Sequence, residues 1–360
     1  MTTTVKRNPD IRKLIRLSPN MIPALGLILA LVVGGVLIYL SGFPPFTAYG
    51  ALIKSAFGSK SGIAETMVKA APLLLAGLGI ALTFKGNINN IGAEGQIYMG
   101  ALGATYVGLF LGDISPWLGI PLIIILGFIA GALWSGLAAF LKLRFNANEI
   151  IITLMLNYVA IEIAKFMISG PWRDPNHTEP FTAVIAKGAK LPVLLAGTRL
   201  HAGIIVGVLA TVILWWVIRR TVYGYQLTIL GANPRTAEYS GIQTSRMIFL
   251  TMLIGGGLCG LAGVSELAGV QHRMIEHLSP GYGYTAIAIA LLGRGNPWGV
   301  LVASILFAGL EVGVQGMQQA AGVPISAAQI LQGTVLLFVV AGFMLRNKLE
   351  IIEQKKKARE

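Results

Sequence analysis

Four long stretches of this chain contain no Asp, Glu, Lys or Arg: residues 21–53, 114–141, 247–265 and 312–345. A helix needs about 20 apolar residues to cross a hydrocarbon core of roughly 30 Å, and each stretch is about that long or longer. Buried helices of soluble proteins rarely stay uncharged over such a length. Charged residues make up only 12% of the chain, about half the share in a typical soluble domain. These runs predict an all-α integral membrane protein.

Shorter or interrupted apolar runs extend the prediction to about ten transmembrane helices. The expected ranges are 21–41, 63–84, 90–112, 116–141, 149–169, 201–219, 247–269, 283–293, 297–317 and 327–346. The eighth range rises only about 16 Å as a helix. It can therefore cross the membrane only where the surrounding chain is shielded by protein.

The basic residues orient these helices. Most of the 28 Lys and Arg lie at the chain ends and in loops that share one side if the N-terminus is cytoplasmic, as the positive-inside rule requires. Without the eighth helix the lysine-rich tail would lie outside, so ten passes with both termini cytoplasmic are expected. The net charge of +13 follows this topology and does not indicate nucleic acid as a partner.

The expected parts of the chain follow from this topology. A basic cytoplasmic segment, 1–20, precedes a transmembrane domain, 21–346, and a basic cytoplasmic tail, 347–360. Two loops are long enough to have structure of their own, an external one at 170–200 and a cytoplasmic one at 220–246. The first apolar run is read as a retained helix, because it is longer than a signal-peptide core and lacks a small-x-small cleavage site.

No motif for catalysis or for a bound cofactor stands out. The chain has no Gly-Lys dipeptide and so no Walker A loop for ATP. It has no His-Glu-x-x-His, and its single cysteine, Cys259, offers no Cys pair for zinc. Two readings of the outer loop with His272, Glu276 and His277 stay open, a metal site and a solvated loop. We expect a chain that is not an enzyme and binds no cofactor or metal itself.

Polar side chains inside apolar spans are costly and often functional. On the third expected helix Asn90, Glu94 and Tyr98 are spaced by four and share one stripe, while Gln96 points nearly the opposite way. On the fifth, Glu149, Thr153 and Asn157 form a second stripe, and Glu162 and Lys165 are spaced for an ion pair. Helix capping and packing are the structural alternative, and Asn148 before Glu149 is typical of an N-cap.

The cytoplasmic loop contains a short, well-delimited helix. Residues 231–241 read GANPRTAEYSG. Asn233 is a good N-cap, Pro234 suits the first helical position and Gly241 suits the terminating position. This pattern predicts a helix of about seven residues, 234–240, which is either a docking element for another protein or an ordinary structured loop.

Three segments resemble the permease subunits of bacterial ABC importers for simple sugars and nucleosides. They are residues 84–96 (FKGNINNIGAEGQ), 230–242 (LGANPRTAEYSGI) and 281–299 (GYGYTAIAIALLGRGNPWG). The resemblance covers roughly residues 60–345. Residues 147–158 (ANEIIITLMLNY) and 170–181 (GPWRDPNHTEPF) look most like the nucleoside branch, with ribose or another sugar as the alternative.

The resemblance implies a type II-like importer permease in the bacterial plasma (inner) membrane. The implied partners are a second permease, paralogous or identical, two ATPase subunits that use ATP and Mg, and a periplasmic or lipoprotein substrate-binding protein. The second segment would transmit motion from the ATPases through Asn233, Pro234, Arg235, Ala237, Glu238 and Tyr239. Candidates for lining the path, chosen by helical facing, are Asn90, Glu94, Tyr98, Thr153, Asn157 and Tyr158.

Two other function classes account less well for the sequence. A secondary transporter or channel would also be a polytopic bundle, but a proton or sodium relay favours an acid at mid-depth, whereas the acids here lie mostly near helix ends. An intramembrane enzyme has only scattered acids to support it.

Overall fold

The structure is a computed structural model that describes residues 21–112 and 115–324, with single positions and short runs between 326 and 345. Within these residues the regular elements are helices. They are α2 (Met21–Leu40), α3 (Pro45–Phe57), α4 (Lys60–Lys85), α5 (Ala93–Phe110), α6 (Pro116–Phe145), α7 (Glu149–Ser169), α8 (Gly203–Arg220), α9 (Val222–Ala232), α10 (Pro234–Tyr239), α11 (Thr244–Glu266), α12 (Tyr282–Gly293) and α13 (Pro297–Ala321), with a short 3₁₀ helix, η1 (Lys187–Ala189), and a π-helical turn, η2 (Leu267–Gln271).

The chain divides into two compact units. The larger unit runs from Ile53 to Val312, and the smaller contains the residues before and after it. In the smaller unit the first apolar run is bent: its helical parts Ile28–Leu40 and Pro45–Phe57 meet at 120°. The Tyr49 hydroxyl donates to the Leu31 carbonyl across this bend at 2.5 Å. The sequence predicts only the first of these two helices.

Helix α11 forms the centre of the larger unit, where it packs on α4, α5 and α6. Glycines allow this close packing: a Cβ at Gly131 would lie 2.5 Å from the Gly256 carbonyl oxygen, and one at Gly255 would lie 2.8 Å from that of Gly79. Small residues bring helix backbones together in lipid, where there is no hydrophobic drive between helices. These glycines therefore let the backbones of α4 and α6 approach α11 closely.

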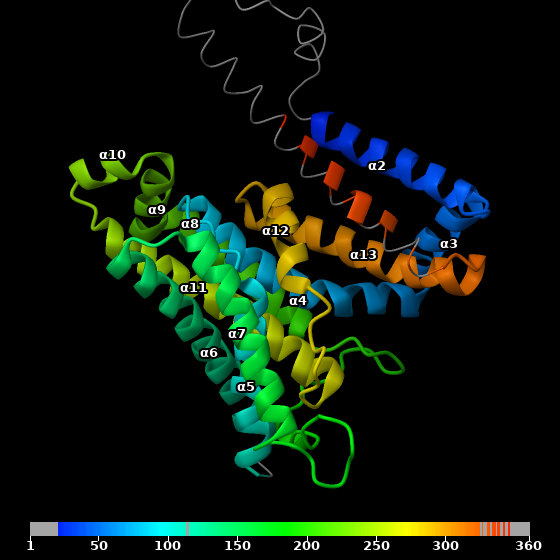
Figure 1. Ribbon diagram of the computed structural model, residues 1–360, viewed down its shortest axis with the longest axis horizontal. Helices are drawn as coiled ribbons and strands as arrows, with labels where there is room; N and C mark the ends of the chain where they lie inside the picture. The colour runs from blue at the N-terminus through cyan, green and yellow to red at the C-terminus, as the bar shows by residue number, and fades with distance from the viewer. Residues whose placement is uncertain are drawn as a thin grey trace, which may run out of the picture. The chain divides into compact units, whose positions relative to one another are not determined.

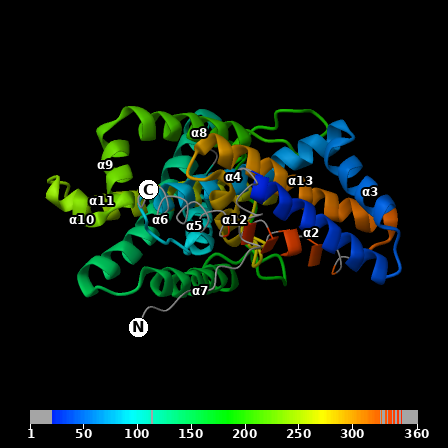
Figure 2. The same cartoon turned by 90° about the horizontal axis from the view of Figure 1, so that it is seen from above.

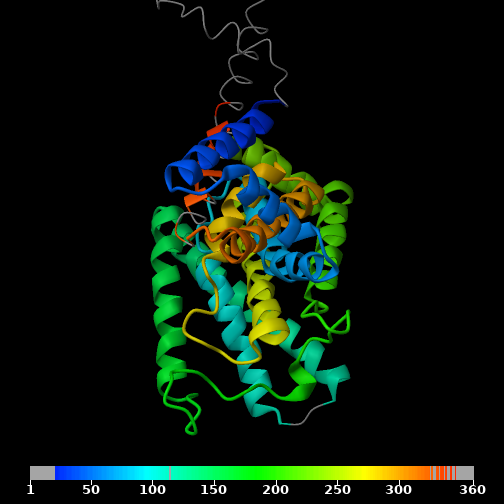
Figure 3. The same cartoon turned by 90° about the vertical axis from the view of Figure 1, so that its right-hand side faces the viewer.

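Helices α7 and α8 flank this centre. Figures 2 and 3 show them on opposite sides of the bundle, with α4, α5 and α12 between them. Helix α7 packs on α5, and α8 packs on α4. The outer faces of α7 and α8 remain largely exposed, as expected for surfaces that meet lipid or another membrane protein.

The two long loops lie at opposite ends of the larger unit (Figure 1). Helices α9 and α10 lie at the end where α11 begins, and α10 contacts α9 and α11. The loop between α7 and α8 lies at the other end, where Leu191 N–H donates to the carbonyl of Ala268, just beyond α11, at 3.0 Å. A helix the length of α11 spans roughly 34 Å, so the two loops are about a membrane thickness apart.

The expected spans agree with the helices through the ninth. In the described part of the chain, six helices are long and apolar enough to cross a membrane, or seven if the bent pair is one span. Helix α12, with 12 residues, corresponds to the short eighth expected span, 283–293. Most of the expected tenth span, 327–346, and the terminal segments 1–20 and 347–360 lie outside the described residues.

Candidate functional site

The helix predicted at 234–240 is present as α10. Asn233 has an extended backbone, and its Oδ1 accepts hydrogen bonds from the N–H groups of Arg235 at 2.9 Å and Thr236 at 3.4 Å. Pro234 occupies the first helical position. The helix therefore begins where the sequence predicts, and it ends at Tyr239, one residue earlier than expected.

The C-terminal end of α10 turns sharply at Gly241, which has φ +77°. The N–H of Ile242 reaches back to the Ala237 carbonyl at 3.0 Å, a glycine-dependent helix termination. Ala237 is buried, so this face attaches α10 to the bundle. Arg235 and Tyr239 are exposed, Tyr239 by 92%, whereas Glu238 accepts from the Thr244 hydroxyl at 3.2 Å.

The connection between α4 and α5 is held by side chains of α7. Asn157 Oδ1 accepts from Gly95 N–H at 2.8 Å, and its Nδ2 donates to the Ile91 carbonyl at 2.9 Å. Thr153 Oγ1 accepts from Ile91 N–H at 3.2 Å. Both side chains are buried. An irregular backbone inside a membrane protein needs such partners, which gives these two predicted path residues a structural role.

Two sequence expectations for this connection are wrong. Asn90 is not part of a helical stripe, because the left-handed turn at Asn87 (φ +56°) leads into irregular chain and α5 begins only at Ala93. Gln96 does not point away from it either. The two amides pair, with distances of 3.1 and 3.2 Å, and both are buried.

Glu94 connects the starts of two helices. It lies in the first turn of α5, and its Oε2 accepts from the Gly283 N–H in the first turn of α12 at 2.7 Å. Ser279 Oγ accepts from the neighbouring Tyr282 N–H at 3.1 Å. A carboxylate at a helix N-terminus is favoured by the helix dipole and by the unpaired N–H groups there. Glu94 is thus an anchor for the short helix α12.

Of the two remaining predicted path residues, Tyr98 is buried and Tyr158 is exposed. Tyr98 is buried on α5, and its hydroxyl donates to the Glu276 carbonyl at 3.3 Å. Tyr158 is 58% exposed on the outer face of α7. An open groove on that face is lined by Tyr158, Val159, Glu162, Ile163 and Phe166. Of the six predicted path residues, Tyr158 is the one that lies on an open surface of the larger unit.

The same face of α7 carries the predicted ion pair. Lys165 Nζ lies 3.2 Å from Glu162 Oε1, and also 3.5 Å from Glu276 Oε1. The Glu162 side chain is 69% exposed, although it lies near the middle of a 21-residue helix. An exposed carboxylate at that depth is unfavourable against lipid, so this face meets protein or water.

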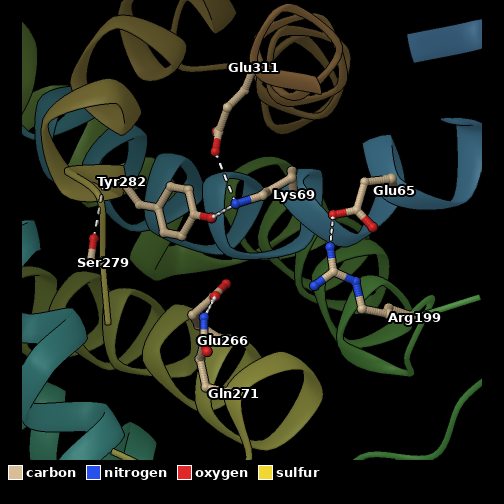
Figure 4. A network of polar contacts seen from close by, with 8 residues as sticks. All are labelled: Glu65, Lys69, Arg199, Glu266, Gln271, Ser279, Tyr282 and Glu311. Carbon is tan, nitrogen blue, oxygen red and sulfur yellow. Dashed lines mark hydrogen bonds and ion pairs between the residues drawn. The ribbon is translucent and has the colours of Figure 1, made fainter. Parts of the chain in front are cut away.

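A second charged cluster, shown in Figure 4, is not among the sites predicted from the sequence. Lys69 on α4 contacts Glu311 of α13 at 3.0 Å and the Tyr282 hydroxyl of α12 at 2.8 Å. One helical turn away, Glu65 pairs with Arg199 of the loop between α7 and α8. The available signal was the i, i+4 spacing of Glu65 and Lys69 near an apolar run.

Within the described residues there is no group of three or more His, Cys, Asp or Glu side chains that could hold a metal ion. The loop containing His272 and His277 therefore brings together no such set there. Cys259 is buried.

Comparison with known proteins identifies relatives of this arrangement. A family model described as branched-chain amino acid transport system / permease component matches residues 62–340. The Haloferax volcanii protein named glucose ABC transporter permease protein TsgB13 is 36% identical over 329 residues, 88% of this chain and 86% of that protein. The Bacillus subtilis guanosine ABC transporter permease protein NupP is 34% identical over 346 residues, 94% of this chain and 98% of that protein. A second Bacillus subtilis protein, named guanosine ABC transporter permease protein NupQ, is 27% identical over 255 residues, 68% of this chain and 79% of that protein.

Proposed function

Because the chain belongs to the family of permease components of branched-chain amino acid transport systems, and is a transport component rather than an enzyme, we propose that it forms the translocation path of an importer for nucleosides. A simple sugar is the alternative substrate, since TsgB13 is named for glucose and NupP for guanosine. Nucleosides are favoured because the match to NupP extends over nearly the whole of both chains.

The observation that carries this proposal is α10. A helix of six residues is too short to be stable alone, and yet this one is capped at both ends and presents Arg235 and Tyr239 to solvent. Such a rigid, exposed element suits contact with a separate ATPase subunit. That subunit would supply the energy for transport, because this chain has no Walker A loop for ATP. Asn233, Pro234, Arg235, Ala237, Glu238 and Tyr239 are the proposed coupling residues, with Ala237 and Glu238 attaching the helix to the bundle.

The groove on α7 is the proposed wall of the path. The exposed Glu162–Lys165 pair disfavours lipid on this face, and a second permease would close the groove from the other side. Tyr158 and Glu162 would then face the solute. Asn90, Glu94, Tyr98, Thr153 and Asn157 would support this wall from behind. The relatives NupP and NupQ favour a paralogous second permease.

Reconstitution tests the proposal. We expect that this chain alone in proteoliposomes neither hydrolyses ATP nor takes up radiolabelled guanosine or glucose. Adding the ATPase, the second permease and the external binding protein should give ATP-dependent uptake of guanosine in preference to glucose. Uptake by this chain alone, driven by an ion gradient, would contradict the proposal and establish a secondary transporter.

Substitutions in α10 test the coupling role. Arg235→Ala and Tyr239→Ala should leave ATP hydrolysis by the assembled complex measurable while reducing uptake per ATP hydrolysed, because both side chains point away from the bundle. Tyr225→Ala on α9 is the matched control, since Tyr225 is an exposed aromatic residue on the neighbouring helix. Equal loss in all three variants would contradict a specific role of α10.

A further inference from the structure

A charge cluster joins α4, α11 and α13 to the loop between α7 and α8 (Figure 4). It contains three carboxylates, Glu65, Glu266 and Glu311, and two cations, Lys69 and Arg199. Arg199 pairs with Glu65, and Lys69 pairs with Glu311. Charges within a membrane bundle are costly and persist where they serve a function, and the proposed path and coupling helix do not use these five.

Lys69 is one cation between two carboxylates. The side chains of Lys69 and Glu311 are 19% and 18% exposed, so little water screens their interaction. Glu266 is buried, accepts from the neutral Gln271 amide at 3.1 Å, and interacts electrostatically with Lys69. An ammonium group has three donors on a flexible stem, and two are used here, by Glu311 and Tyr282. Glu266 is therefore a second carboxylate whose charge acts on Lys69 at longer range.

The same lysine fixes the first turn of α12. Tyr282 directs its hydroxyl to Lys69, whereas Tyr284, two residues later, lies about 200° further around the helix. The Tyr284 side chain lies near Asn157 and Tyr158 of α7. One side of this turn is thus attached to the charge cluster, and the other side borders the groove on α7.

We propose that Lys69 is a positioning residue of the translocation path: it holds the first turn of α12 in place and, when that turn moves, its ammonium group passes from Glu311 to Glu266. This inference rests on the proposed function, because it takes the groove on α7 as the path. A single cation between one buried carboxylate, Glu266, and one partly buried carboxylate, Glu311, could take two discrete arrangements, which is what a switching element requires. The position of Tyr284 beside the groove on α7 would then depend on which carboxylate Lys69 contacts.

Cysteine labelling measures the position of Tyr284 without requiring transport. Tyr284→Cys is made in the full chain, whose only native cysteine, Cys259, is fully buried, and membranes are treated with a small charged thiol reagent. Adding Lys69→Met should raise the labelling rate about tenfold, because breaking a buried pair strongly destabilises the arrangement it holds. Lys69→Arg should restore most of the original rate.

Lys142→Met is the matched control. Lys142 pairs with Glu149 at 3.1 Å, with side chains 23% and 19% exposed, nearly the same values as for Lys69 and Glu311, but it joins α6 to α7. It should leave the labelling rate at position 284 unchanged. An unchanged rate in the Lys69→Met chain, or an equal rise in the control, would overturn the proposal.

Substitutions of the two carboxylates have different expected effects on labelling. They test the proposal even if the Lys69→Met chain does not accumulate in the membrane. Glu311→Gln should release Lys69 toward Glu266 and speed labelling, whereas Glu266→Gln should leave Lys69 on Glu311 and not speed it. Equal acceleration by both would exclude a switch between them. If labelling responds as expected but the wild-type complex takes up neither guanosine nor glucose, the proposed function fails and the positioning role stands.

Discussion

His201 is a buried titratable side chain in the loop between α7 and α8. It is 1% exposed, and its ring fills the space that side chains at Gly203 and Gly269 would occupy. Its Nδ1 accepts from the Gly203 N–H at 3.1 Å, so the neutral ring carries its proton on Nε2. Burial, with a smaller contribution from repulsion by His272, lowers the pKa of His201 to about 4. Protonation would place an N–H donor on Nδ1, facing the Gly203 N–H donor.

The loop should therefore open more readily in acid. A histidine whose pKa is about 6.5 when exposed and about 4 in place stabilises the closed loop fully above pH 6.5. That contribution decreases as the pH falls toward 4 and then stays constant, a total loss of about 3 kcal/mol. Hydrogen exchange at Leu194 and Ala202, corrected for the intrinsic rate, should rise over this interval.

Two variants check the origin of this pH dependence. His201→Phe keeps a ring in the space and removes the titrating group, so exchange should no longer depend on pH between 4 and 6.5. His177→Gln, in the same loop, should leave the dependence intact, because His177 is largely exposed. Persistence of the dependence in the Phe variant would assign it to another group.

At the residue scale the sequence predicts which side chains are unusual better than it predicts which groups those side chains contact. It identifies Asn157 and Glu94 as unusual because they are polar among apolar neighbours. It does not show that Asn157 holds the backbone of Ile91 and Gly95, since those contacts join residues 62 and 66 positions apart. Facing on an ideal helix is also a poor guide before a helix begins, which is why the stripe through Asn90 is wrong.

Helix α10 shows which elements could be predicted. Its start and stop depend on local chemistry, an Asn, a Pro and a Gly at fixed spacing, and the structure has them where expected. The π-helical turn at Leu267–Gln271 and helix α3 have no comparable local signal. The span predicted at 247–269 correspondingly ends in a π turn, and the bend after α2 follows from Gly42 (φ +86°) and the prolines that come next.

Removing the cap of α10 should destabilise the whole helix. Asn233→Ala leaves two N–H groups without their acceptor, at a cost of about 1 kcal/mol, and α10 has only six residues over which to retain structure. Amide exchange from Arg235 to Tyr239 should rise about fivefold together, and Asn233→Asp should restore protection.

Asn148→Ala provides the matched comparison. Asn148 caps α7 through a hydrogen bond of the same length, 2.9 Å, to Ile150 N–H, but α7 has 21 residues. Only its first turn should exchange faster. If α10 loses protection only at Arg235 and Thr236, the helix is stabilised mainly by packing of Ala237, and the cap is not decisive.

The two ends of the larger unit differ in sequence. Lys85, Lys142, Arg144, Arg219, Arg220 and Arg246 lie at the termini of helices that end or begin near α9 and α10. The opposite end carries the loop between α7 and α8, with its proline-rich sequence. By the positive-inside rule the α10 end should be cytoplasmic, as contact with an ATPase requires.

Single exposed cysteines test this orientation. Tyr239→Cys places a thiol on α10, and Glu179→Cys places one in the loop between α7 and α8, where both native side chains are exposed. A membrane-impermeant maleimide should label position 179 in intact spheroplasts and position 239 only after permeabilisation, while the wild-type chain with buried Cys259 stays unlabelled. Labelling of position 239 from outside would reverse the topology. It would also remove α10 as a coupling element, because an ATPase that uses cytoplasmic ATP cannot reach a helix on the external face.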